Sequence, residues 1–372
     1  MKEVISKNLF IVSLLHLLVD FTSAGSVVTS YFVFGSNYLN ITYIFLIYNC
    51  FAFLLQPFFG LLVDNFKEDK LKVMLKAFLL ISIGTLLLGF TLTLFAISFS
   101  SFKNFITLCF ASVLLGCGNA FFHVVGGKEA LLMSDKATPG GIFVSFGSIG
   151  VGLSTIMFIS KISNFIKFSY IYISPILLII LSLLYMFSKE SHEAPIYRSF
   201  KKNKTSIFIT IVVILCLAIA VRSFLGFYSK MSPDISGASA IFLLSFVAFI
   251  GKAIGGIILD LAGPYFLIGV STILTSILSI FLRISYIDYI FVIAFNLLMP
   301  LTLDALRKCF VSKEGFAFGL AASFLIPGYL LGGISKNYGN QAIIIPIISF
   351  LTGISLLEIY ILNRKVIDER DN

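Results

Sequence analysis

The sequence predicts an all-α membrane protein with twelve transmembrane helices in two pseudo-symmetric six-helix bundles, and three observations lead to this prediction. The 372-residue chain is 58% hydrophobic and only 12% charged, whereas soluble domains carry about 25% charged residues. Apolar runs of about 20 residues, each able to cross a bilayer as a helix, recur along the whole chain. Two runs far apart end in Gly-three apolar residues-Asp, at Asp64 and Asp260, which is typical of internal duplication.

The apolar runs predict helices rather than the strands of a β-barrel, because they do not alternate between apolar and polar residues. The N-terminus has some features of a signal peptide, but His16 and Asp20 interrupt its apolar run, so we expect a retained first helix. Short gaps with charged, Gly or Pro residues separate the runs. The predicted spans are 9–32, 41–63, 74–98, 104–125, 140–161, 168–188, 206–229, 238–260, 265–283, 286–303, 316–335 and 341–363.

The longest polar segment lies in the middle of the chain and divides the spans into six plus six. We therefore expect an N-terminal six-helix bundle over 1–188, a basic cytoplasmic linker over 189–205 and a C-terminal six-helix bundle over 206–372.

The distribution of Lys and Arg predicts the orientation in the membrane. Of the 27 basic residues, 19 lie on the side that carries both termini and 6 lie in the opposite loops. By the positive-inside rule both termini are cytoplasmic, in a multi-pass protein of the cytoplasmic (inner) membrane. The net charge of +9 could suggest nucleic-acid binding, but its placement in the gaps between spans argues for lipid contact instead. The mean hydropathy of +1.03 agrees with a membrane protein.

Twelve spans, the six-plus-six division, the basic central segment and Gly-xxx-Asp after spans 2 and 8 together resemble the major facilitator superfamily over essentially the whole chain. In that family the loop after span 2 carries Gly-xxx-Asp-basic-x-Gly-x-basic. This chain retains Gly60, Asp64 and a late lysine, Lys70, whereas Asn65 and Phe66 replace the first basic residue and the second glycine.

The copy of this motif after span 8 retains Gly256 and Asp260 but has no basic residue. We expect the five retained residues to form gating and helix-end contacts at the cytoplasmic face. Asp304 and Arg307 are expected in the same charge layer.

Four shorter stretches are similar to the fosmidomycin-resistance-type branch of the family. They are His16-xxx-Asp20, Gln56-Pro57-xx-Gly60-xxx-Asp64, Gly116-Cys-Gly118-Asn119-Ala120-Phe121-Phe122-His123, and Arg222-Ser223. The branch has Pro where this chain has Val124, and span 5 lacks the Gly-Pro of the superfamily's drug antiporters. The resemblance implies export of a small drug or metabolite in exchange for protons, and the missing Gly-Pro weakens that implication.

Ionisable residues inside a membrane are expensive and usually functional. Asp20 lies near the middle of span 1, and His16 lies one turn earlier on the same face. A buried carboxylate beside an imidazole suits proton coupling. The alternative is a structural pair that holds span 1 to a neighbouring helix.

Three further residues are candidates for substrate or proton-coupling contacts. Arg222 in span 7 would bind an anionic substrate or pair with Asp20 across the two halves, unless it extends toward the outer surface. His123 and Asn119 near the end of span 4 would add polar contacts, unless they only pack against a neighbouring helix. Lys252 in span 8 is either a cavity charge or a side chain that extends to the membrane surface.

The chain has no phosphate-binding loop, no Ser-His-Asp pattern and no spacing typical of metal ligands, so we expect no enzyme activity, no cofactor and no metal. The expected partners are protons, the lipid bilayer and a small, anionic molecule, and the expected state is a monomer.

We therefore predict a secondary transporter that performs proton-coupled efflux by alternating access. An uncoupled facilitator or importer of an organic anion is the first alternative. A membrane-embedded enzyme such as an acyltransferase and a non-transporting sensor are the others. The enzyme predicts that His16 and Asp20 face a lipid groove, and the transporter predicts that they line a central cavity.

Overall fold

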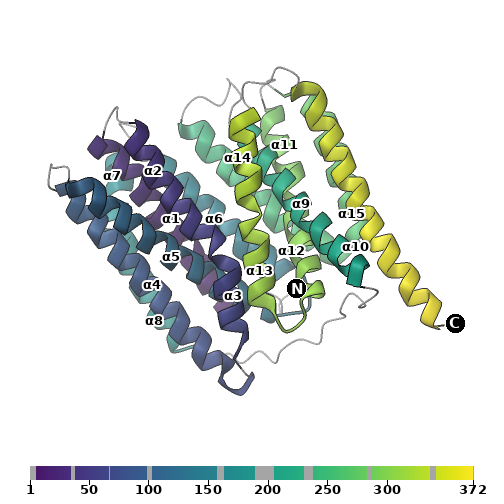
Figure 1. The fold of residues 1–372 in the computed structure, drawn as a ribbon, viewed down its shortest axis with the longest axis horizontal. Helices are drawn as coiled ribbons and strands as arrows, with labels where there is room; N and C mark the ends of the chain where they lie inside the picture. Colours follow the sequence, from purple (N-terminus) through teal and green to yellow (C-terminus); the bar gives the residue numbers. More distant parts are fainter. Residues whose placement is uncertain are drawn as a thin grey trace.

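The structure, a computed structural model, describes residues 6–34, 38–66, 68–98, 103–156, 163–188, 205–229, 238–282, 286–335 and 341–371, which are helical apart from short turns. The helices form two groups that lie side by side (Figure 1). The purple-to-blue group contains the first half of the chain and the green-to-yellow group the second. Most of the predicted linker, residues 189–204, lies outside the described residues.

The N-terminal half crosses the membrane six times, and two of its crossings contain a π-helical turn. The second crossing is continuous through α2, η1 and α3, and the sixth through η2 and α8. The elements are α1 (Lys7–Phe34), α2 (Tyr38–Asn49), η1 (Cys50–Leu54), α3 (Gln56–Asp64), α4 (Glu68–Ser98), α5 (Lys103–Leu132), α6 (Thr138–Ile156), α7 (Ser163–Phe168), η2 (Ser169–Ile173) and α8 (Ser174–Met186).

The C-terminal half repeats this organisation with helix pairs that each make one crossing. Helices α11 and α12 are joined at Leu297, and α13 and α14 at Phe324. The elements are α9 (Thr205–Ser229), α10 (Ala238–Ile280), α11 (Ile287–Asn296), α12 (Leu298–Cys309), α13 (Glu314–Ser323), α14 (Leu325–Ser335) and α15 (Gln341–Asp371).

Among the described residues, eleven helical stretches are long and apolar enough to cross a membrane, and one of them serves as two. The stretch Phe242–Ile280 has 39 residues, about 58 Å at 1.5 Å per residue, against roughly 30 Å of hydrocarbon. Gly263 breaks it with φ 80° and ψ 172°, directly before Pro264. Glycine adopts this φ without strain, and proline ends helical hydrogen bonding. The predicted twelve crossings and fold class are confirmed.

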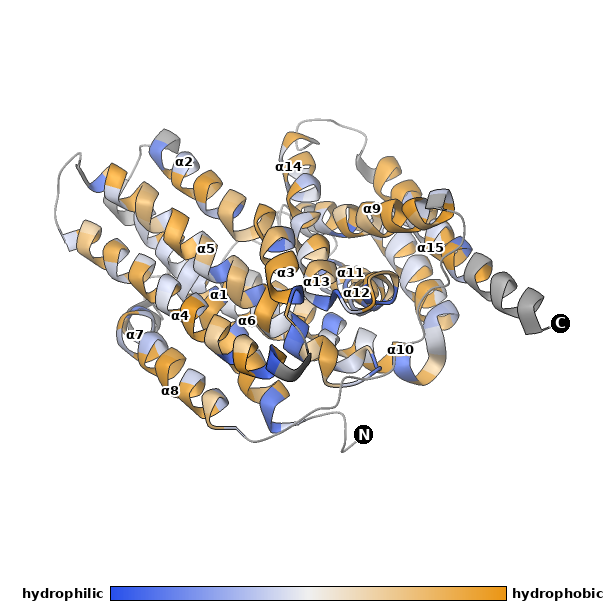
Figure 2. Ribbon diagram, turned by 60° about the horizontal axis from the view of Figure 1, so that its bottom comes forward, coloured by the Kyte–Doolittle hydropathy of each residue, from blue (hydrophilic) through white to orange (hydrophobic). Residues whose placement is uncertain are grey.

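The outer faces of both halves are apolar, as Figure 2 shows by the orange colour along most of each helix. Large hydrophobic side chains such as Phe58, Phe110 and Leu217 are more than half exposed. In water such a surface would be unfavourable, whereas hydrocarbon chains cover it without cost.

The two halves meet along two helix pairs. Helix α3 packs against α13, which lies beside it in Figure 1, and α6 packs against α10. Glycines allow the close approach, since a methyl group at Gly60 would lie 2.5 Å from the carbonyl oxygen of Gly315. A methyl group at Gly256 would likewise lie 3.0 Å from Thr138 Cα. Small residues at such crossings let helix backbones pack tightly inside a membrane.

Candidate functional site

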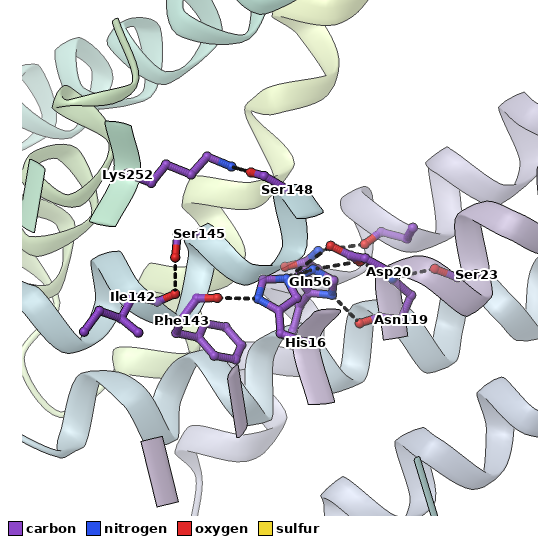
Figure 3. A network of polar contacts seen from close by, with 12 residues as sticks. His16, Asp20, Ser23, Gln56, Asn119, Ile142, Phe143, Ser145, Ser148 and Lys252 are labelled. Atoms are coloured by element: carbon purple, nitrogen blue, oxygen red, sulfur yellow. Dashed lines mark hydrogen bonds and ion pairs between the residues drawn. The ribbon is translucent and has the colours of Figure 1, made fainter. Parts of the chain in front are cut away.

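Two pairs of polar side chains meet inside the N-terminal half (Figure 3). Helix α1 supplies His16 and Asp20, and α5 supplies Asn119 and His123. Each pair is four residues apart, so both members project from the same helix face. The side chains of His16, His123 and Asp20 are 4%, 12% and 14% exposed. His16 and Asp20 share one face of α1, as their spacing predicts, and the structure places that face against α5 and away from lipid.

The centre of the site, which we call the His–Asp cluster, consists of His16, Asp20 and His123. The two Nε2 atoms lie 2.8 Å apart. Asp20 Oδ2 lies 3.3 Å from His16 Nε2, and Asp20 Oδ1 lies 3.4 Å from His123 Nε2. Both imidazole rings therefore direct their Nε2 atoms toward each other and toward one carboxylate.

The Nδ1 contacts determine where the protons of this cluster lie. His16 Nδ1 lies 2.7 Å from the carbonyl oxygen of Phe143, and His123 Nδ1 lies 2.8 Å from that of Asn119. A carbonyl oxygen only accepts, so each Nδ1 must donate, and a neutral imidazole has only one N–H. Two bare Nε2 atoms at 2.8 Å would then repel, so their contact requires one additional proton. One imidazolium, one imidazole and one carboxylate, with no net charge, would satisfy all of these contacts.

A second layer of hydrogen bonds orients the carboxylate. Asn119 Nδ2 donates to Asp20 Oδ1 at 3.0 Å and to Ser23 Oγ at 3.1 Å. The hydroxyl of Tyr48 donates to the same Ser23 Oγ at 2.9 Å. Gln56 lies nearby in Figure 3, and its buried Oε1 has no hydrogen-bond partner among the described residues. Asn119 therefore contacts Asp20 directly, which the sequence did not show.

Helix α6 covers the cluster and contributes a glycine that sequence reasoning did not single out. A methyl group at Gly147 would lie 2.5 Å from both Asp20 Oδ2 and His16 Nε2. Phe143, one turn earlier, stacks its ring on His16 with centroids 4.4 Å apart. The sequence shows several glycines in this span, but it does not show which residues they contact.

The three groups of the His–Asp cluster could also hold a metal ion, since one ligand atom from each lies within 4.8 Å of the others. Tetrahedral ligands at 2.0–2.1 Å from a metal stand about 3.3 Å from one another. The two Asp20 separations match that value, but the Nε2 separation of 2.8 Å is shorter. The geometry here fits a shared proton, and a metal ion would have to spread the two rings.

Lys252 connects the cluster region to the C-terminal half. Its Nζ donates to Ser148 Oγ at 2.6 Å, linking α10 to α6 next to Gly147. The side chain of Lys252 thus contacts the other half of the molecule.

Arg222 does not lie beside the His–Asp cluster. It lines a pocket within the C-terminal half, between α9, α10, α12 and α15. Its Nε is buried, and the described residues provide no hydrogen bond to it. The pairing with Asp20 that we considered from the sequence is not among the contacts of this structure.

At one end of the α3–α13 contact, Asp64 caps the N-terminus of α13. Its carboxylate accepts from Gly315 N at 3.0 Å and from Phe316 N at 2.7 Å. Lys128 on α5 donates to Asp64 Oδ1 at 2.7 Å, and both side chains are almost fully buried. Glu314 lies 3.9 Å from the same ammonium. A carboxylate is favoured at a helix N-terminus, where backbone N–H groups lack partners.

Asp260 makes the matching contact at the other helix pair. Its carboxylate accepts from Ala137 N at 2.8 Å and from Thr138 N at 2.9 Å, at the N-terminus of α6. The hydroxyl of Thr138 also donates to it. Asp260 is exposed, and no basic side chain pairs with it among the described residues. Both Gly-xxx-Asp sequences thus use Gly for close approach and Asp as a cap across the two halves.

Arg307 forms a third connection at this face. Its guanidinium donates to the carbonyl oxygens of Leu131, Ser134 and Asp135 at 3.1, 2.8 and 2.6 Å, and it pairs with Asp304. These carbonyls lie at the C-terminal end of α5 and in the turn after it, where a cation is favoured.

The basic partner of Asp64 was not identified from the sequence. Lys70, the late lysine of the motif, is exposed near the start of α4, and Lys128 forms the ion pair instead. A lysine after two glycines at the end of an apolar span was the available signal. It could not show which of several basic residues would reach Asp64.

No protein-family model and no curated protein sequence matches the chain. The chain does match solved structures. The chain is similar to the E. coli fucose:proton symporter FucP, with a TM-score of 0.66, 14% identity, and coverage of 97% of this chain and 98% of that one. It is also similar to a bacterial homologue of the iron transporter ferroportin in an outward-facing state, with a TM-score of 0.61, 12% identity, and 97% and 99% coverage. The major facilitator fold is confirmed by these two similarities.

Proposed function

We propose that the chain is a secondary active transporter that exports a small molecule across the cytoplasmic membrane by alternating access, in exchange for protons. Its fold is that of a proton symporter and of a homologue of a metal transporter. Because these similarities concern the fold alone, the mechanism is argued from the residues of this chain.

The observation that carries the proposal is the geometry of the His–Asp cluster, in which two imidazoles and one carboxylate meet. The Nδ1 contacts of both rings and the Nε2 separation of 2.8 Å require a proton between His16 and His123, balanced by Asp20. Three ionisable groups that share protons inside a membrane span are typical of a proton relay. Asp20, as a carboxylate, balances the charge of that proton, and Asn119 Nδ2 donates to the carboxylate and keeps it oriented.

Lys252 supplies a link between the proton and the conformation. It belongs to the half that does not contain the cluster, yet it donates to Ser148 on α6, the residue after Gly147, which lies against Asp20 and His16. When the two halves change their relative orientation, the distance between this ammonium and the imidazoles changes. A nearer positive charge disfavours the proton, and a more distant one favours it. Proton release and uptake are thereby coupled to the access state.

The helix-end contacts supply the gate. Asp64, Asp260 and Arg307 all join the two halves at one face. Given the predicted orientation of the termini, that face is cytoplasmic, and this conformation is closed toward the cytoplasm. Opening it requires that each carboxylate leaves the N-terminus of a helix of the other half.

The proposal is tested in proteoliposomes that contain a pH-sensitive dye. Under an imposed pH gradient, a panel of small organic anions, cationic drugs, sugars and divalent metal ions is added in turn. We expect at least one compound to accelerate proton movement, and Asp20→Asn to abolish the effect. Asp135→Asn, an exposed aspartate, is the matched control and should behave as wild type.

Proton movement that survives in Asp20→Asn would refute the assignment of the coupling site. A compound that crosses without any proton movement would favour the uncoupled facilitator or importer. The enzyme alternative has less support, because His16 and Asp20 face α5 and α6 inside the bundle rather than lipid.

A further inference from the structure

The C-terminal half contains a pocket in which four polar atoms lack hydrogen-bond partners among the described residues. It is lined by Arg222 of α9 and by the hydroxyl side chains of Thr272, Thr275, Thr302, Ser349 and Thr352. The remaining lining residues are apolar, so the pocket has a low-dielectric wall. It lies within one half and therefore apart from the His–Asp cluster.

The missing hydrogen bonds are concentrated here. Ten buried side-chain nitrogen or oxygen atoms have no hydrogen-bond partner in the described part of the chain, and four of them belong to residues of this pocket. They are Arg222 Nε and the hydroxyl oxygens of Thr272, Thr275 and Ser349. Buried polar groups normally find partners, so a cluster of unsatisfied donors needs an explanation.

The unpaired hydroxyls differ from most of their kind in this protein. Hydroxyls inside membrane helices usually donate to a carbonyl three or four residues earlier in their own helix. Ser26, Ser82 and Thr93 do so, and so do Thr302 and Thr352 in the pocket itself. The hydroxyls of Thr272, Thr275 and Ser349 make no such bond. Their protons remain available to a ligand.

The charge of the pocket is also unbalanced. Arg222 has no ion pair with any described residue, and no acidic side chain is among the residues that line the pocket. A guanidinium has five N–H donors and no acceptor, and three free hydroxyls add donors around it. A partly buried cation with free donors beside it is complementary to an anion.

We propose that this pocket binds a small monovalent anion, either a halide such as chloride or the carboxylate group of a larger molecule. The cavity volume of the pocket is about 30 Å³, and one water molecule needs roughly 10–15 Å³ of such volume. The space therefore suits a single ion or one carboxylate group. Because the pocket lies in the other half from the proton site, the anion is a second ligand of the proposed transporter.

The test measures binding without transport. Full-length protein in detergent is unfolded thermally with a thiol-reactive dye that reports its five cysteines. Chloride or acetate replaces isethionate at constant ionic strength. We expect a saturable rise in Tm with one or both anions. In Arg222→Met the midpoint of that rise should move at least tenfold higher in anion concentration, whereas Lys72→Gln, an exposed lysine on α4, should leave it unchanged.

Thr275→Val keeps the proposal testable if Arg222→Met fails to fold. It removes one unpaired hydroxyl, so the Tm without added anion should stay level or rise. The anion-dependent increment should nevertheless shrink. A response to chloride alone identifies a halide site, and a response to acetate alone identifies a carboxylate site.

An anion effect that does not saturate, or that is equal in wild type and in either variant, would refute the proposal and leave a water-filled pocket. The inference rests on the proposed function only for its biological role. Asp20→Asn should retain the anion response even though it loses proton coupling, so the two proposals can fail separately.

Discussion

Neutralising Asp64 should weaken the contact between the two halves far more than neutralising Asp260 does. Both carboxylates cap a helix of the opposite half, but their surroundings differ. Asp64 is buried against Lys128, whereas Asp260 is exposed and has no basic partner among the described residues. The two Gly-xxx-Asp sequences therefore provide a matched pair of substitutions, Asp64→Asn and Asp260→Asn.

The magnitudes follow from burial. The side chains of Asp64 and Lys128 are 2% and 3% exposed, and α13 packs on α5 in this structure. Asp64→Asn would leave a buried ammonium with Glu314 3.9 Å away. Removing one partner of a buried pair costs about 3–5 kcal/mol. Because Glu314 remains near the ammonium, we expect a cost at the lower end of this range. Loss of an exposed cap such as Asp260 costs about 1 kcal/mol, since water replaces part of it.

Hydrogen–deuterium exchange of the capped amides measures this difference in the stability of the closed state. The closed state should lose about 3 kcal/mol in stability in Asp64→Asn and about 1 kcal/mol in Asp260→Asn. These losses raise the equilibrium constant for opening roughly 150-fold and roughly fivefold. We expect exchange at Gly315 and Phe316 to accelerate by the first factor, and exchange at Ala137 and Thr138 by the second. Local opening of this kind sets the exchange rate of protected amides.

Asp135→Asn is the control, because its backbone carbonyl rather than its carboxylate accepts the hydrogen bond from Arg307. Equal acceleration in Asp64→Asn and Asp260→Asn, or a larger effect in the second, would refute the reasoning. It would mean that water reaches Lys128 in the closed state, or that the cap itself dominates the contact.

Substitutions at three further positions test other contacts. Gly147→Ala should reduce transport by at least about tenfold with little change in Tm, because the added methyl group would displace Asp20 from the geometry that the site requires. Unchanged transport in this variant would contradict the placement of α6 against the cluster. Gly60→Ala should cost about 1–3 kcal/mol by overpacking against Gly315 and should accelerate the same α13 amides as Asp64→Asn. Arg307→Lys should not restore the stability lost in Arg307→Met, measured by Tm, because one ammonium cannot reach three carbonyls.

The spans were predictable because hydrophobicity and length are local properties. Twelve crossings follow from runs of apolar residues, and even the division of the longest helix is visible as Gly263-Pro264. The shared face of His16 and Asp20 was predictable for the same reason, since a four-residue spacing determines it on any helix. The expectation that Asp64 and Asp260 make helix-end contacts also needed only their positions at span ends.

The partners of these residues were not predictable from one sequence, because they lie far away along the chain. Asp64 meets amides 251 and 252 residues later, and His16 meets His123 107 residues later. Several lysines stand near the motif, and only packing selected Lys128 over Lys70.

The sequence by itself thus determined a twelve-span membrane protein, its division into two halves and the polar residues buried within it. The tertiary structure decided which of those residues meet. It placed two imidazoles 2.8 Å apart over one carboxylate, and it placed Arg222 in the other half among unpaired hydroxyls. The physical reason is that apolar helices are specified by local composition, whereas proton sharing and charge pairing depend on ångström-scale distances that arise only when the helices pack.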